Sequence, residues 1–94
     1  MVNNQEARLV VVDDEPSIRE LLSASLRFSG FEVITASNGT EAIEVIVDSQ
    51  PDLIIMDVMM PDIDGFTVTS RIRQEGIDAP VLFLTAGDGI NRWW

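Results

Sequence analysis

The sequence predicts an α/β domain in which a doubly wound parallel sheet carries helices on both of its faces. Short apolar runs alternate along the chain with longer segments whose apolar residues recur at helical spacing. The first run, residues 8–12, is rich in valine, which is typical of a strand buried on both faces. Strands that are separated by helices are joined by right-handed crossovers, so these strands should lie parallel.

The first helix should begin at Pro16, because acidic residues followed by proline are typical of a helix N-terminus. Apolar side chains in this segment recur at helical spacing, at Ile18, Leu21, Leu22 and Leu26. Gly30 should end the helix, since glycine is favoured just past a helix C-terminus.

The remaining elements continue the same alternation. Strand, helix, strand, helix and strand are expected over residues 31–36, 40–49, 52–57, 66–74 and 79–85. Ser37, Asn38 and Gly39 supply the turn before the second helix, and Pro51 ends that helix. The strand over residues 52–57 ends in a carboxylate, Asp57.

Composition limits the classes of function. A chain of 94 residues suits one small domain, and a hydrophobic content of 46% is too high for a disordered chain. The absence of Cys and His excludes disulfides, thiolate zinc sites and histidine-based catalysis. A net charge of −10, with arginine as the only basic residue, opposes nucleic-acid binding and favours cations or basic partners. We expect a cytoplasmic domain, since neither a membrane span nor a signal peptide is recognisable.

Acidic side chains follow two of the expected strands at the point where each strand ends. Asp13 and Asp14 follow the first strand, Asp57 ends the third, and Thr85 ends the fourth. Carboxyl ends of parallel strands meet at one edge of a sheet, so three carboxylates converge if the first and third strands are neighbours. Such a cluster favours Mg²⁺, which prefers oxygen ligands and relieves repulsion between like charges. Alternatively, Asp13, Asp14 and Glu15 cap the following helix, and Asp57 is a solvated loop residue.

Three segments resemble the signatures of bacterial response-regulator receiver domains. These segments are residues 10–15, 57–65 and 84–86, and the likeness covers about residues 8–86. It is strongest to the OmpR/PhoB-type regulators, in which a winged-helix DNA-binding domain follows the receiver. The resemblance implies a flavodoxin-like fold and a single receiver domain over residues 1–94, with residues 87–94 as a divergent tail.

The resemblance also implies residue roles. Asp57 would be the phosphoacceptor, which receives a phosphoryl group from a sensor histidine kinase. The implied Mg²⁺ ligands are Asp14, Asp13 (largely through water), Asp57 and the main-chain carbonyl of Met59. The groups implied to hold the phosphoryl oxygens are the Thr85 hydroxyl and the main-chain N–H groups of Val58 and Ala86.

The likeness ends after Ala86. The family's fourth helix, fifth strand and fifth helix are not expected here, so the domain would be C-terminally truncated, and the family's lysine cannot be present because the sequence has none. We therefore expect an open sheet edge along residues 81–84 and an uncovered apolar face beside it. A homo-oligomer should form through that edge, with Trp93 and Trp94 buried at the contact. The family's DNA-binding domain is not expected in these residues, so they should not bind nucleic acid.

Two functions remain open. The first is a phosphoacceptor module of two-component signalling, which is not an enzyme acting on an external substrate and which regulates transcription in the full-length family. The alternative is an interaction or oligomerisation unit of receiver ancestry that does not switch, and the missing lysine favours it. A metal-dependent phosphatase would need an acid where Met59 stands. Residues 62–65 resemble part of an EF-hand, but Met60 and Arg71 occupy positions that require carboxylates.

Overall fold

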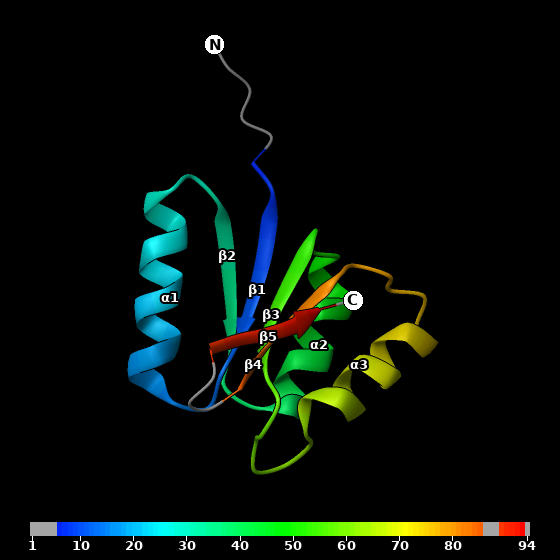
Figure 1. Cartoon of the computed structure of the whole chain (residues 1–94). Helices are drawn as coiled ribbons and strands as arrows, with labels where there is room; N and C mark the ends of the chain where they lie inside the picture. The colour runs from blue at the N-terminus through cyan, green and yellow to red at the C-terminus, as the bar shows by residue number, and fades with distance from the viewer. Residues whose placement is uncertain (1–5, 86–88, 94) are drawn as a thin grey trace.

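The computed structural model describes residues 6–85 and 89–93, with side chains as far as Leu84. The first seven elements follow the predicted order, with bounds within two residues of those expected, and an eighth element, the last strand, was not predicted (Figure 1). They are β1 (Arg8–Val12), α1 (Pro16–Phe28), β2 (Glu32–Ala36), α2 (Gly39–Ser49), β3 (Leu53–Asp57), α3 (Gly65–Gln74), β4 (Val81–Thr85) and β5 (Gly89–Trp93). None of the described helices is long and apolar enough to cross a membrane.

The sheet has the strand order β2-β1-β3-β4-β5, and its first four strands are parallel. From β1 the chain moves outward to β2 on one side, then returns to β3 and β4 on the other side. This reversal puts a topological switch point between the carboxyl ends of β1 and β3, where ligands of such sheets bind. The predicted doubly wound α/β fold is confirmed.

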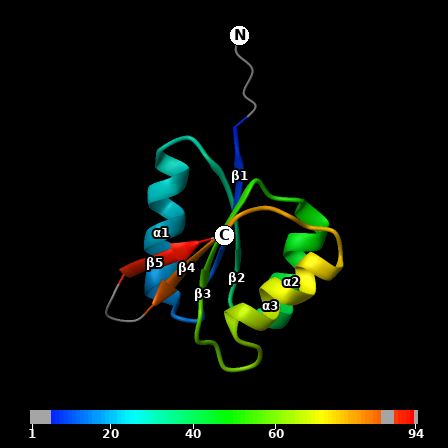
Figure 2. The ribbon, with the colours of Figure 1, turned by 45° about the vertical axis from the view of Figure 1, so that its right-hand side comes forward.

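Helices cover the two faces unequally. α1 lies on one face, and α2 and α3 lie together on the other (Figures 1 and 2). Successive side chains of β1 alternate between these faces, so Val10 and Val12 belong to the core under α2 and α3, whereas Val11 belongs to the core under α1. Among the residues whose side chains the structure describes, the first core is the larger, with thirteen buried residues against three.

The expected open edge at β4 is wrong. β5 runs antiparallel along β4, with Leu82 opposite Trp93 and Thr85 opposite Gly89 in the backbone register. An unpaired edge presents a row of N–H and C=O groups, and the segment that follows β4 is the nearest chain that can bond to them. A homo-oligomer was expected to form through an open β4 edge. Because β5 occupies that edge, the structure gives no basis for this contact. The expectation that Trp93 and Trp94 are buried concerns side chains that lie outside what the structure describes.

The expectation of an uncovered apolar face concerns the side of α1, where the side chains that follow Leu84 lie outside the described residues. This helix packs against β2 and β1, and it leaves the side chains on β3 and β4 partly open to solvent. Leu53, Leu82 and Leu84 are half-buried there, next to the small core of Val11, Val33 and Ile55.

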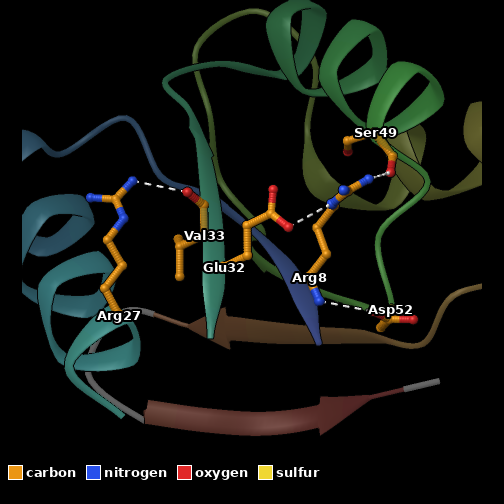
Figure 3. Close-up of polar contacts among 6 residues, drawn as sticks. All are labelled: Arg8, Arg27, Glu32, Val33, Ser49 and Asp52. Atoms are coloured by element: carbon orange, nitrogen blue, oxygen red, sulfur yellow. Dashed lines mark hydrogen bonds and ion pairs between the residues drawn. The ribbon is translucent and has the colours of Figure 1, made fainter. Parts of the chain in front are cut away.

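Arg8 holds together the end of the sheet at which β1 begins (Figure 3). Its guanidinium pairs with Glu32 at 3.1 Å and donates to the Ser49 carbonyl at the end of α2. Its main-chain N–H donates to the Asp52 carboxylate at 2.8 Å, just before β3. One residue thus connects two strands, one helix and the loop that enters β3.

Candidate functional site

Three carboxylates gather at the carboxyl ends of β1 and β3. Val12 lies opposite Met56 in the register of these neighbouring strands, so the residues that follow, Asp13 and Asp57, emerge side by side. One carboxylate oxygen from each of Asp13, Asp14 and Asp57 can be chosen so that all three lie within 4.8 Å of one another. The convergence predicted from the strand ends is therefore confirmed.

The three acids differ in exposure and electrostatics. Asp13 is only 3% exposed, Asp57 is half-buried and Asp14 is exposed. Burial raises the pKa of Asp13, and the neighbouring Asp14 and Glu15 charges add to the rise. Burial also raises the pKa of Asp57, with Asp13 as the next cause. Because burial and like charge both disfavour the ionised forms, a bound cation would stabilise this cluster.

Hydrogen bonds fix Asp13 in place. Its carboxylate accepts from the Glu15 main-chain N–H at 2.9 Å, which opposes the rise in its pKa. Its main-chain N–H donates to the Ala36 carbonyl on β2 at 3.2 Å, and its carbonyl accepts from the Arg19 guanidinium at 2.8 Å. Arg19 was not predicted as a site neighbour, because nothing in the helical pattern indicates that its side chain reaches back to β1.

The loop between β3 and α3 closes tightly over the end of β3. The Gly65 main-chain N–H donates to the Val58 carbonyl at 2.8 Å, so the loop returns to the point where it left the strand. A Cβ at Gly65 would lie 2.6 Å from the Asp57 carbonyl oxygen, so only glycine fits without a shift of the backbone. Met59 lies in this loop and is 73% exposed.

Only part of the predicted phosphoryl-binding set lies within the described residues. The Val58 main-chain N–H donates to the Leu84 carbonyl at 3.3 Å and also lowers the pKa of Asp57. Leu84 pairs with Asp57 in the backbone register, so Thr85 follows at the same edge of the sheet. The Thr85 side chain and all of Ala86 lie outside what the structure describes.

The donor set fits Mg²⁺. It consists of carboxylate oxygens, two of which belong to residues whose burial raises their pKa, and hard divalent cations prefer such ligands. The donor set agrees with the predicted Mg²⁺ cofactor.

This fold and site define a class of signalling module, and the chain belongs to the response regulator receiver domain family. The family model matches residues 9–92. Among curated proteins, the chain is 48% identical over 85 residues to the "Probable transcriptional regulator ycf27" of Pyropia yezoensis. It is 44% identical over 84 residues to the "Response regulator MprA" of Mycobacterium sp. (strain KMS). These alignments cover 90% and 89% of this chain but only 35% and 36% of the relatives, so the chain spans about a third of their length.

Solved structures give the same result. The response regulator TrrA from Thermotoga maritima, in complex with Mg(2+)-BeF, has a TM-score of 0.80 and 45% identity, over 87% of this chain and 71% of that one. The chemotaxis response regulator CheY4 of Vibrio cholerae has a TM-score of 0.84 and 36% identity, over 90% and 72%. The predicted family and receiver fold are therefore confirmed.

Proposed function

We propose that this receiver domain accepts a phosphoryl group on Asp57 from a sensor histidine kinase. The observation that carries the proposal is the convergence of Asp13, Asp14 and Asp57 within 4.8 Å at the switch point of the sheet. A carboxylate oxygen of Asp57 would attack the phosphorus of a phosphohistidine. The P–N bond would break, and its electron pair would return to the imidazole nitrogen, which takes up a proton.

The chain supplies a nucleophile and the means to hold the incoming group. Asp57 supplies a carboxylate oxygen as the nucleophile. Mg²⁺, when bound, would neutralise charge on the transferring oxygens. We assign its binding to Asp14, Asp57 and the Met59 carbonyl, with Asp13 acting largely through water.

The phosphoryl oxygens need donors as well. We assign this role to the Thr85 hydroxyl and to the main-chain N–H groups of Val58 and Ala86. The bond from the Val58 N–H to the Leu84 carbonyl is long at 3.3 Å, so this donor can be released at small cost.

The remaining proposals concern the whole protein. We assign residues 1–94 to one receiver domain of a cytoplasmic regulator of transcription, in line with the names of the relatives. The acidic receiver itself, with its net charge of −10, would not contact nucleic acid. If copies of the domain associate, the backbone groups available for pairing belong to the two edge strands, β2 and β5, and not to β4.

A second function has one specific observation in its favour. The sequence contains no lysine, so no lysine of these residues can pair with a phosphoryl group. For residues 1–94 taken by themselves, we keep as the alternative an interaction unit of receiver ancestry that does not switch.

Intact-protein mass spectrometry separates the two functions. The native chain is incubated with acetyl phosphate and Mg²⁺, and the Asp57→Asn variant serves as the control. We expect one phosphoryl group on the native chain, none on the variant, and loss of labelling when Mg²⁺ is chelated. Equal labelling of the variant would refute the assignment of Asp57, and absence of labelling on the native chain would favour the interaction unit.

A further inference from the structure

Asp62 lies in the loop between β3 and α3, yet its carboxylate bonds to a different element. One oxygen accepts from the Gly39 main-chain N–H at 2.9 Å. The other accepts from the Thr40 main-chain N–H at 2.9 Å and from the Thr40 hydroxyl at 2.8 Å. Asp62 is exposed, so these three bonds, and not burial, hold its side chain against the start of α2.

These bonds complete the start of α2. The first N–H groups of a helix have no partner within the helix itself. The Asn38 side chain satisfies only the Glu41 N–H, at 2.8 Å, and Asp62 satisfies those of the first two helical residues. The donated hydrogen bonds, foremost that from the Thr40 N–H, hold the pKa of Asp62 well below its usual range, so the carboxylate stays ionised at neutral pH.

Backbone contacts reinforce the same junction. A Cβ at Gly39 would lie 2.6 Å from the Ile63 carbonyl oxygen, so the loop rests directly on the first residue of α2. The far end of the loop is closed by the bond from the Gly65 N–H to the Val58 carbonyl. Met59 lies between these two attachments, and its exposed side chain contributes little packing that could fix the backbone.

We propose that Asp62 is a positioning residue, which ties the loop of residues 58–64 to α2 and thereby sets the position of the Met59 carbonyl beside the three acids. The inference rests on the proposed function, because it takes that carbonyl as a metal ligand. Asp62 itself does not touch the metal or the phosphoryl group. Its effect on the site passes through the loop backbone.

Mg²⁺ binding to the Asp62→Ala variant, measured by isothermal titration calorimetry, tests the proposal. Loss of a group that orients a metal ligand typically lowers affinity about 10- to 100-fold, and we expect a loss of at least about 10-fold. The matched control is Asp52→Ala, since Asp52 accepts the Arg8 main-chain N–H at the opposite end of the sheet (Figure 3). Both variants lose one negative charge and carboxylate bonds to the main chain, two from Asp62 and one from Asp52, but only the first should lose Mg²⁺ affinity.

Amide hydrogen exchange without metal gives a second, independent measurement. In the Asp62→Ala variant the Gly65 amide should exchange faster, because the loop it closes is no longer anchored to α2, whereas Asp52→Ala should leave it unchanged. Thr40→Val, which removes only the hydroxyl donor, should give a smaller effect on both measurements. If the native chain binds no Mg²⁺, the proposed metal role fails, and the Gly65 amide still decides whether Asp62 anchors the loop. Native exchange at Gly65 in Asp62→Ala, or equal losses of Mg²⁺ affinity in both variants, would overturn the proposal.

Discussion

Gly65→Ala tests whether the close return of the loop onto β3 is essential. The added Cβ would lie 2.6 Å from the Asp57 carbonyl oxygen, 3.2 Å from the Val58 Cα and 3.3 Å from the Phe83 ring, whereas ordinary contact begins at 3.4 Å. Two of these neighbours are backbone atoms, which cannot rotate away. Overpacking of this kind costs about 1–3 kcal/mol. At about 4–8 °C per kcal/mol for a domain of this size, the melting temperature should fall by roughly 5–20 °C.

Gly76→Ala is the matched control for this variant. Gly76 has a φ of +87° with no atom within 4 Å of the added Cβ, so the substitution costs only the strain of a left-handed backbone, about 1–2 kcal/mol. Both variants should melt at a lower temperature by differential scanning fluorimetry. Only Gly65→Ala should also slow the labelling of Asp57 by acetyl phosphate, because only there must the backbone of the site move. Native melting together with native labelling in Gly65→Ala would refute the reasoning.

Three further predictions concern the acids and the sheet edge. Asp14→Asn should weaken Mg²⁺ binding strongly and Asp13→Asn less, and equal titration curves for both variants and the native chain would contradict this assignment. The pKa of Asp13 is raised in the folded chain, so the unfolded chain ionises this group more readily. The free energy of unfolding should therefore fall as the pH rises through and above the usual range of an aspartate. Without metal, Asp13→Asn should therefore melt above the native chain by a margin that grows from acid to neutral pH and that Mg²⁺ diminishes. Deletion of residues 89–94 should expose the outer edge of β4 and raise the scattering mass with concentration, whereas a concentration-independent monomer would contradict this.

The sequence predicts most of the fold because its signals are local. Each signal involves only residues that are neighbours in the sequence. Examples are the valine run of β1, Pro16 at the start of α1 and the carboxylate that ends β3. The convergence of the acids also follows, since strand ends share one edge of a parallel sheet. Helical periodicity alone, however, groups Leu21 with the residues facing the core, whereas the structure leaves it 68% exposed, with no element of the described chain covering that side.

Two features depend on tertiary contacts and could not be predicted. The segment of β5 contains Gly89 and Asn91, which have low strand propensity, and it pairs because β4 offers an adjacent edge. The bonds of Asp62 to α2 join residues 22 and 23 positions apart, and no periodic pattern links them. The nearest sequence signal is the helix start at residues 38–40. It shows that main-chain N–H groups there need an acceptor, but it does not identify Asp62 as that acceptor.

The unequal division of the core implies unequal cooperativity. α1 covers only a small apolar cluster, whereas α2 and α3 share the large one, so the free energy needed to detach α1 should be well below that of global unfolding. Such a subglobal opening would take Arg19 away from the Asp13 carbonyl and remove a positive charge that lowers the pKa of that acid. Brief detachments of α1 would thus change the proton affinity of the site, and occupation of the site by a cation would in turn change how often α1 detaches.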